Sequence, residues 1–378
     1  MKKISITSIG LFIAALHLLP SLWPGPLGGQ AHAQVRILMG TWDLNGQGLP
    51  QAVYNLGYAI EVQQPGGTYR RYSISASSWA LMTATDIDGY PGAELVINQG
   101  STIRVIRDRN ATVRDYSTSA GSWAAMGYVD TDATVGNEII LNLGTTIRII
   151  HDRTGLVRDY GMPAGSWALM GFADLDGDGS QDLALNIVTQ VRVLSDKTGV
   201  IRDYYVSSGS WALMGMEDLN GDNIKDLAIN IGGYIRVIHH VNGIVRDYAT
   251  STGSWALMGF QDTDATAGLE MVINLGSRIR IIRDRNATTR DFTTSTGSWA
   301  LLGFSDTDGH PGIELVVNLG STVRIMSDYY GTTHDYYITS GSWALVGIYD
   351  ADGKAGDEVV INTLSGTRTI YDATGTIR

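Results

Sequence analysis

Cysteine is absent from the 378-residue chain, so no disulfide can stabilise it and no thiol can act as a nucleophile. The sequence also lacks G-x-S-x-G and H-E-x-x-H, which are motifs of serine hydrolases and zinc peptidases. Beyond the N-terminal region, no apolar run is long enough to span a membrane, and no helical period of 3.6 residues appears. A basic excess is lacking too: the net charge of −11 argues against nucleic acid as a partner and suits bound cations.

The first 33 residues have the pattern of an export signal. Lys2 and Lys3 form a positive start, residues 9–19 are apolar, and Ala31-His32-Ala33 is a cleavage site of small residues. The apolar run is too short, and too interrupted by proline, to cross a bilayer. We therefore expect residues 1–33 to be removed and residues 34–378 to be secreted or periplasmic, without membrane insertion.

One unit of about 44 residues recurs along the remaining chain. A fixed period of this size is typical of solenoids, propellers and other arrays. An asparagine repeats with the same spacing as a tryptophan that always lies in Ser-Trp-Ala. The tryptophans are Trp79, Trp123, Trp167, Trp211, Trp255, Trp299 and Trp343.

The unit at residues 166–209 contains four strand patterns, at 167–173, 182–187, 190–194 and 200–206, separated by Gly, Asp, Ser and Thr. Four strands in such a unit make one propeller blade. We predict an all-β fold, an eight-bladed β-propeller with four antiparallel strands per blade that closes in sequence order; seven blades are the alternative. The domain 34–378 divides into repeats 34–77, 78–121, 122–165, 166–209, 210–253, 254–297, 298–341 and 342–378.

An arginine recurs in the third strand of the repeats. The segment 196–199 (DKTG) predicts a type I turn with a glycine bulge, which places Arg192 opposite Tyr204, whereas a two-residue loop would place it opposite Asp203. We expect these arginines to pack on or pair with the neighbouring strand. A ring of ligand-binding arginines is the alternative.

Acidic loops join the first and second strands. Repeat four has Asp174, Asp176, Asp178 and Asp182, and repeat five has Asp218, Asn220, Asp222 and Asp226. Carboxylates at alternate positions of a tight loop converge on one centre, as calcium with its six to eight oxygen ligands requires. Four acids this close would repel one another without a cation. These eight residues are the strongest predicted metal ligands.

Five further loops keep three acids each, and they either bind metal or retain only the turn. Repeat one has Gln51 at the closing position and is expected to bind none. The weaker candidates are Asp86, Asp88 and Glu94; Asp130, Asp132 and Glu138; Asp262, Asp264 and Glu270; Asp306, Asp308 and Glu314; and Asp350, Asp352 and Glu358.

This loop between two strands, repeated around a ring, resembles the FG-GAP or VCBS-type repeats of integrin α-chain propellers and of secreted bacterial proteins. The resemblance covers the whole of 34–378 and is most specific at 174–182 and 218–226. The Phe-Gly…Gly-Ala-Pro pattern is missing, and Ser-Trp-Ala-Leu-Met-Gly belongs to this protein's own repeat. The resemblance implies a propeller and calcium but no single activity, since such propellers include adhesive, carbohydrate-binding and enzymatic proteins.

No residue presents itself as catalytic, because a near-perfect repeat offers no asymmetric constellation. We expect ordinary surface histidines, and the adjacent pair His239 and His240 should point to opposite faces of its strand. The repeated Trp and Asn are interpreted as structural. Aromatic residues of the outer strands are either sugar platforms or packing between blades: Tyr116, Tyr160, Tyr204, Tyr205, Tyr248, Phe292, Tyr336 and Tyr337.

Repetition favours binding over catalysis, because equivalent surfaces on a rigid ring can hold a multivalent ligand. The predicted function is a secreted calcium-binding module for carbohydrate or another extracellular glycan or protein surface, acting as a monomer. The alternatives are a calcium-dependent polysaccharide-degrading lyase or hydrolase and a structural scaffold without a ligand. Whether the protein is an enzyme stays open, with binding preferred.

Overall fold

A computed structural model describes residues 36–378 except 75–77, 119–121, 164, 208, 251–253, 295–297 and 339–341. The predicted signal segment 1–33 lies outside the described residues. Among the residues that are described, no helix is long and apolar enough to cross a membrane.

The described residues form eight four-stranded antiparallel sheets, each from four consecutive strands. The first four sheets are β1 (Ile37–Trp42), β2 (Gln51–Asn55), β3 (Ala59–Gln63) and β4 (Tyr69–Ser73); β5 (Ala80–Thr85), β6 (Glu94–Asn98), β7 (Thr102–Arg107) and β8 (Thr112–Ser117); β9 (Ala124–Val129), β10 (Glu138–Asn142), β11 (Thr146–His151) and β12 (Leu156–Gly161); β13 (Ala168–Ala173), β14 (Asp182–Ile187), β15 (Gln190–Ser195) and β16 (Val200–Tyr205).

The other four sheets are β17 (Ala212–Glu217), β18 (Asp226–Asn230), β19 (Tyr234–His239) and β20 (Ile244–Ala249); β21 (Ala256–Gln261), β22 (Glu270–Asn274), β23 (Arg278–Arg283) and β24 (Thr288–Thr293); β25 (Ala300–Ser305), β26 (Glu314–Asn318), β27 (Thr322–Ser327) and β28 (Thr332–Tyr337); β29 (Trp343–Tyr349), β30 (Glu358–Thr363), β31 (Gly366–Tyr371) and β32 (Thr376–Ile377). Short 3-10 turns follow three third strands: η1 (Asp108–Asn110), η2 (Asp284–Asn286) and η3 (Asp372–Thr374).

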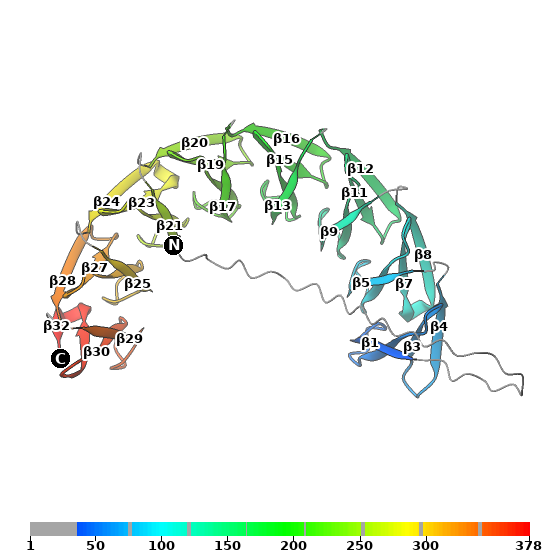
Figure 1. Ribbon diagram of the computed structural model, residues 1–378, viewed down its shortest axis with the longest axis horizontal. Coiled ribbons are helices and arrows are strands. Elements are labelled where there is room, and N and C mark those ends of the chain that lie inside the picture. The colour runs from blue at the N-terminus through cyan, green and yellow to red at the C-terminus, as the bar shows by residue number, and fades with distance from the viewer. Residues whose placement is uncertain are drawn as a thin grey trace, which may run out of the picture.

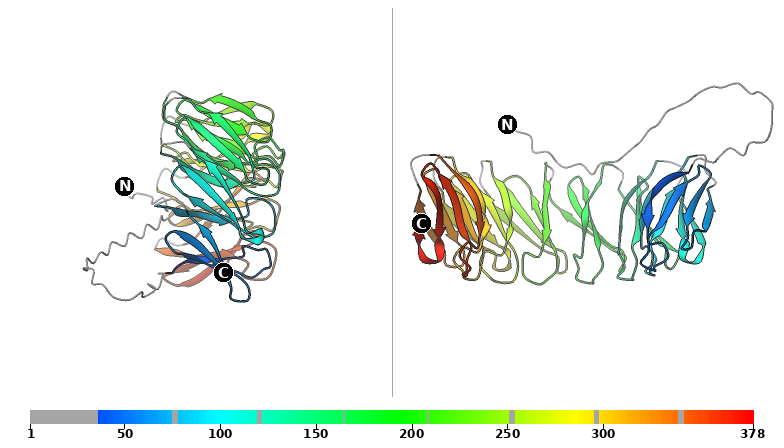
Figure 2. Two further views of the ribbon diagram at one scale, coloured as in Figure 1. Left: turned by 90° about the vertical axis from the view of Figure 1, so that its right-hand side faces the viewer. Right: turned by 90° about the horizontal axis from the view of Figure 1, so that it is seen from below.

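The sheets are the blades of an eight-bladed β-propeller, as predicted, and we number them 1 to 8 in chain order. The first strand of each blade lies on the concave side of the array and the fourth on the convex side (Figure 1). Neighbours in sequence stand side by side (Figure 2). The blades follow an arc, with β1–β4 at one end and β29–β32 at the other, so the expected closing of the ring is not what this structure shows.

Side chains along each strand alternate between the two faces of the sheet, so each blade packs against two neighbouring blades. In blade 4, Val191 and Val193 belong to a buried cluster with Leu227 and Ile229 of blade 5. Leu194, the next residue along β15, belongs instead to the cluster shared with blade 3. Because successive side chains point to opposite faces of a sheet, one apolar strand serves two interfaces. The core is therefore divided into layers between blades.

The hairpin register differs from the preferred prediction. Ser195 pairs with Val200 across a four-residue turn, and this places Arg192 opposite Asp203 rather than Tyr204. Arg192 Nε donates to Asp203 Oδ1 at 2.6 Å. Equivalent pairs join Arg104 to Asp115 and Arg236 to Asp247. The repeated arginines are thus engaged within their own sheets, as the structural interpretation held.

Candidate functional site

The antiparallel order gives the array two faces. Loops from first to second strand and from third to fourth strand lie at one end of each sheet, which we call the acidic face. Turns from second to third strand and connections between blades lie at the other end, which we call the tryptophan face. All the predicted metal ligands lie on the acidic face.

Blade 4 holds its acidic loop by short backbone contacts. The Asp174 carboxylate accepts hydrogen bonds from the backbone N–H groups of Gly177 at 2.7 Å and Gly179 at 3.0 Å. Asp182 Oδ2 accepts from Leu175 N–H at 3.0 Å. These bonds fold the loop back on itself, so that one oxygen each of Asp174, Asp176 and Asp182 lie within 4.8 Å of one another.

Among the residues that the structure describes, two oxygens of this loop are buried without a hydrogen-bond partner, Asp182 Oδ1 and Asp178 Oδ2. The Asp182 side chain is fully buried, and burial together with nearby Asp176 raises its pKa to about 7. Lys197 lies at the rim of the loop, where its ammonium donates to the Asp178 carbonyl oxygen at 2.5 Å and is 3.8 Å from Asp178 Oδ1. A bound cation would supply the missing partner, and the oxygen-only ligand set fits calcium.

Blade 7 repeats this arrangement. Glu314 Oε2 accepts from Thr307 N–H at 2.9 Å, while Glu314 Oε1 is buried without a partner. Burial raises the pKa of Glu314 to about 7, and Asp308 acts in the same direction. The third strand ends in Ser327, as β15 ends in Ser195. In both blades the acids therefore lack a basic residue at the strand end beside them.

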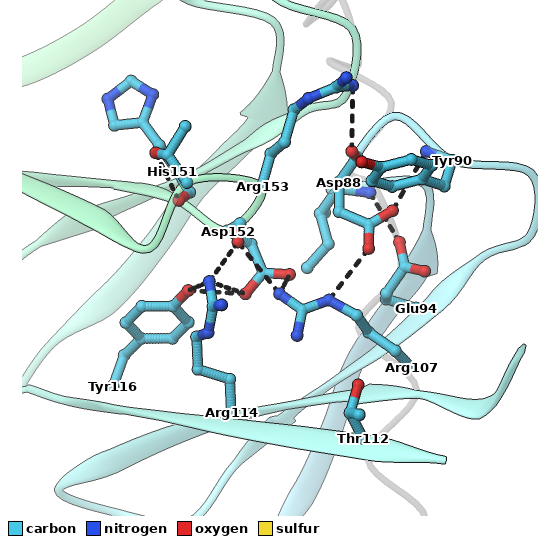
Figure 3. Close-up of polar contacts among 12 residues, drawn as sticks. Asp88, Tyr90, Glu94, Arg107, Thr112, Arg114, Tyr116, His151, Asp152 and Arg153 are labelled. Atoms are coloured by element: carbon cyan, nitrogen blue, oxygen red, sulfur yellow. Dashed lines mark hydrogen bonds and ion pairs between the residues drawn. The ribbon is translucent and has the colours of Figure 1, made fainter. Parts of the chain in front are cut away.

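Blades 2 and 6 differ because arginines enter their acidic loops. Arg109 Nη1 donates to Glu94 Oε1 at 2.8 Å and Arg109 also pairs with Asp88. Arg107, at the end of β7, contacts Asp88 at 2.9 Å and reaches Asp152 of blade 3 (Figure 3). In blade 6, Arg283 and Arg285 contact Asp264 at 3.0 and 2.6 Å.

Histidines take the same position in blades 3 and 5. His151 Nδ1 lies 3.1 Å from Asp132, and His239 Nδ1 lies 2.8 Å from Asp226, a predicted metal ligand. The second nitrogen of each ring contacts the turn aspartate of the next blade, Asp196 or Asp284. Burial opposes protonation, but the carboxylates outweigh it and raise the pKa of both imidazoles to about 9.

The expectation of surface histidines is wrong for three of them, since His151, His239 and His240 are buried. Their position next to an acidic loop and a blade junction was not visible in the sequence alone. The signal that was available is the residue type at the end of the third strand, which is basic in blades 2, 3, 5 and 6 and serine in blades 4 and 7. His239 and His240 do contact different partners, as their adjacency predicted.

A second repeated contact joins the blades near the acidic face. The tyrosine of the fourth strand donates to the turn aspartate of the next blade, as Tyr116 does to Asp152 at 2.6 Å (Figure 3). Arg114 donates to the carbonyl oxygen of the same aspartate at 2.5 Å. Tyr116, Tyr204, Tyr248, Phe292 and Tyr336 are buried, so these positions pack between blades, while Tyr205 and Tyr337 are exposed.

On the tryptophan face, another repeated set of hydrogen bonds joins neighbouring blades. Asn186 Oδ1 accepts the N–H of Val188 at 2.8 Å, and Trp211 of blade 5 donates its indole N–H to the Val188 carbonyl oxygen at 2.6 Å. The same pair of bonds recurs around Gly100, Gly144, Gly232, Gly276 and Gly320. The structural interpretation of the repeated Trp and Asn agrees with these contacts.

Comparisons with known proteins leave the family open. No family model matches the chain, and no curated protein matches it. Solved structures that match include virginiamycin B lyase from Staphylococcus aureus, with 16% identity over 77% of this chain and 98% of that one, at a TM-score of 0.33. A lectin from Agrocybe aegerita that recognises non-reducing terminal N-acetylglucosamine matches at 11% identity over 75% and 88%, with a TM-score of 0.36.

AztD from Citrobacter koseri matches at 11% identity over 91% of this chain and 93% of that one, with a TM-score of 0.34. Identities and scores this low carry no argument about function. The resemblance to FG-GAP or VCBS-type repeats therefore stays a prediction from the acidic loops.

Proposed function

We propose that this chain is an exported, calcium-stabilised β-propeller that acts as a multivalent binding module, with carbohydrate as its ligand. The observation that carries the proposal is repetition: the same Trp–Asn link recurs at each junction on the tryptophan face. Several weak copies of one site on a rigid array bind a repetitive ligand with high avidity. Export rests on the sequence of residues 1–33.

Calcium has a structural role in this proposal, and it binds in blades 4 and 7. Support comes from the buried, unpartnered oxygens of Asp182 and Glu314. Asp262 Oδ1 of blade 6 is buried and unpartnered as well, but Arg283 and Arg285 contact Asp264 in that loop. In blades 2, 3, 5 and 6, Arg109, His151, His239 and Arg285 already provide positive charge beside the acids. The chain thus uses two means of neutralising one repeated loop, a metal ion or a basic side chain.

The test is a count of bound calcium by mass spectrometry, with thermal melts in calcium and in excess chelator. We expect two ions per chain and a lower melting temperature after chelation, since an ion that binds only the folded state stabilises it. Asp182→Asn should remove one ion and Glu314→Gln the other. The matched control is Asp226→Asn in blade 5, where His239 occupies the loop, and this change should leave the count unaltered.

A chain without calcium, or a count that falls with Asp226→Asn but not with Asp182→Asn, would contradict the metal assignment. The binding half is tested separately on a glycan array, comparing the protein with glycans at high and low surface density. We expect binding that falls steeply as density decreases. Absence of binding to every glycan would overturn the proposed function.

A further inference from the structure

On the tryptophan face, the described residues form a cavity whose wall contains two tryptophans. The cavity has a volume of about 340 Å³ and lies between blades 4 and 5. Trp167 and Trp211 line it together with Asn186, Val188, Ser166 and Ser210. A cavity on blade 7, lined by Trp299, Asn318 and Gly320, has about 230 Å³ and only one tryptophan in its wall.

Val188 makes this junction unusual. It has a positive φ of 61°, whereas six equivalent turns have a glycine with positive φ at this place. A β-branched residue in the left-handed region is a rare and costly conformation, and such strain concentrates at functional sites. The Val188 side chain is 60% exposed, so it forms the wall of the cavity rather than part of the core.

Some polar groups that line the cavity already form hydrogen bonds within the protein, and this limits which ligands the cavity can bind. Trp167 and Trp211 donate their indole N–H groups to the carbonyl oxygens of Gly144 and Val188. Both rings are partly buried against core clusters, and the part of each ring that stays uncovered lines the cavity. Asn186 uses Oδ1 to accept from Val188 N–H, and within the described part of the chain its Nδ2 has no partner. The lining has no charged residue.

We propose that this cavity is a binding site for a neutral sugar ring. Aromatic faces cover the apolar C–H surface of a pyranose, and the Asn186 amide and the serine hydroxyls bond to its hydroxyl groups. The lack of charge disfavours uronic acids and sugar phosphates, whose charge would be desolvated without a counter-ion. The inference rests on the proposed function and assigns a place and a ligand class to it.

The experiment titrates the full-length mature protein with N-acetylglucosamine, glucose, galactose, mannose and glucuronate, and follows binding by saturation-transfer NMR and by indole resonances. We expect a neutral hexose to bind and to shift the resonances of Trp167 and Trp211, with glucuronate inactive. Asn186→Asp keeps the acceptor for Val188 N–H but removes the amide donor, and it should weaken binding at least tenfold. The matched control is Asn242→Asp in a hairpin turn on the acidic face, where Asn242 Oδ1 likewise accepts a backbone N–H, from Ile244 at 2.9 Å; this change should leave affinity unchanged.

Val188→Gly distinguishes an effect on binding from an effect on folding, because it introduces the glycine that equivalent turns have at this position. This variant should melt at a higher temperature than the wild type and bind the sugar more weakly. Sugar binding that survives both Asn186→Asp and Val188→Gly would place the ligand elsewhere and overturn the site, while the binding function would stand. If the wild type binds none of the sugars and no glycan on the array, the proposed function fails as well.

Discussion

Some single residues differ from the residue that the repeat has at the same position, and His240 is one of them. His240 occupies the turn position that holds an aspartate in other blades, such as Asp152 and Asp284. Its Nδ1 lies 2.9 Å from Tyr204 Oη, where a carboxylate oxygen lies elsewhere. Burial lowers the pKa of His240 to about 4, and nearby Arg202 acts in the same direction.

This shift makes stability depend on pH. An unfolded imidazole titrates near 6.5, so between about pH 4 and 6.5 the unfolded chain binds a proton that the folded chain excludes. Stability is therefore lost as pH falls through this window. We expect His240→Asp to raise the free energy of unfolding by about 2 kcal/mol more at pH 5 than at pH 8. Urea denaturation at both pH values measures it, and an equal gain at both would count against the argument.

At the scale of the strand and turn, the blades are joined by recurrent polar contacts around a buried aspartate. Asp152 is fully buried and accepts hydrogen bonds from the preceding blade. Tyr116 and Arg107 donate to its carboxylate, and Arg114 donates to its backbone carbonyl oxygen (Figure 3). These contacts join the hairpin turn of one blade to the outer strands of another. They hold the acidic face, whereas the Trp–Asn links hold the opposite face.

Removing the buried Asp152 carboxylate should lower the free energy of unfolding far more than breaking an ion pair at the surface. Asp152→Ala leaves buried donors without a partner, and we expect a loss of about 3 kcal/mol in the free energy of unfolding. The control is Asp115→Ala, which breaks the exposed pair with Arg104 and should cost less than about 1 kcal/mol. Equal losses for the two variants, measured by urea denaturation, would show that the buried contact contributes nothing special.

At the scale of the whole molecule, the two ends of the arc differ from the internal interfaces. Val323 and Ile325 of blade 7 are buried against Val359 and Ile361 of blade 8. The corresponding positions of blade 8 are Thr367 and Thr369, and Thr367 is exposed. End units of repeat arrays need a polar outer face to stay soluble, so these threonines act as a cap in this structure.

The cap can be tested by restoring the internal pattern. The double substitution Thr367→Val and Thr369→Ile gives blade 8 the apolar face of blade 7. We expect concentration-dependent association, because an exposed aliphatic face of this kind packs against another one. Sedimentation velocity over a range of concentrations detects it. Val113→Ile on the outer strand β8 serves as the control, and a double variant that stays monomeric at every concentration would contradict the capping role.

The sequence by itself determined the repeat, the blade number and the strands, because the 44-residue spacing of Trp79 to Trp343 and the alternation of apolar residues are local properties. It also located the acidic loops, whose ligands are close together in the chain. Tertiary structure decided which acidic loops an arginine or histidine enters, since Arg109 reaches Asp88 from the turn η1 and His239 reaches Asp226 from β19. It also decided that the array is an arc and that Trp167 and Trp211 flank one cavity, because contacts between blades join residues 44 positions apart, and no local pattern specifies them.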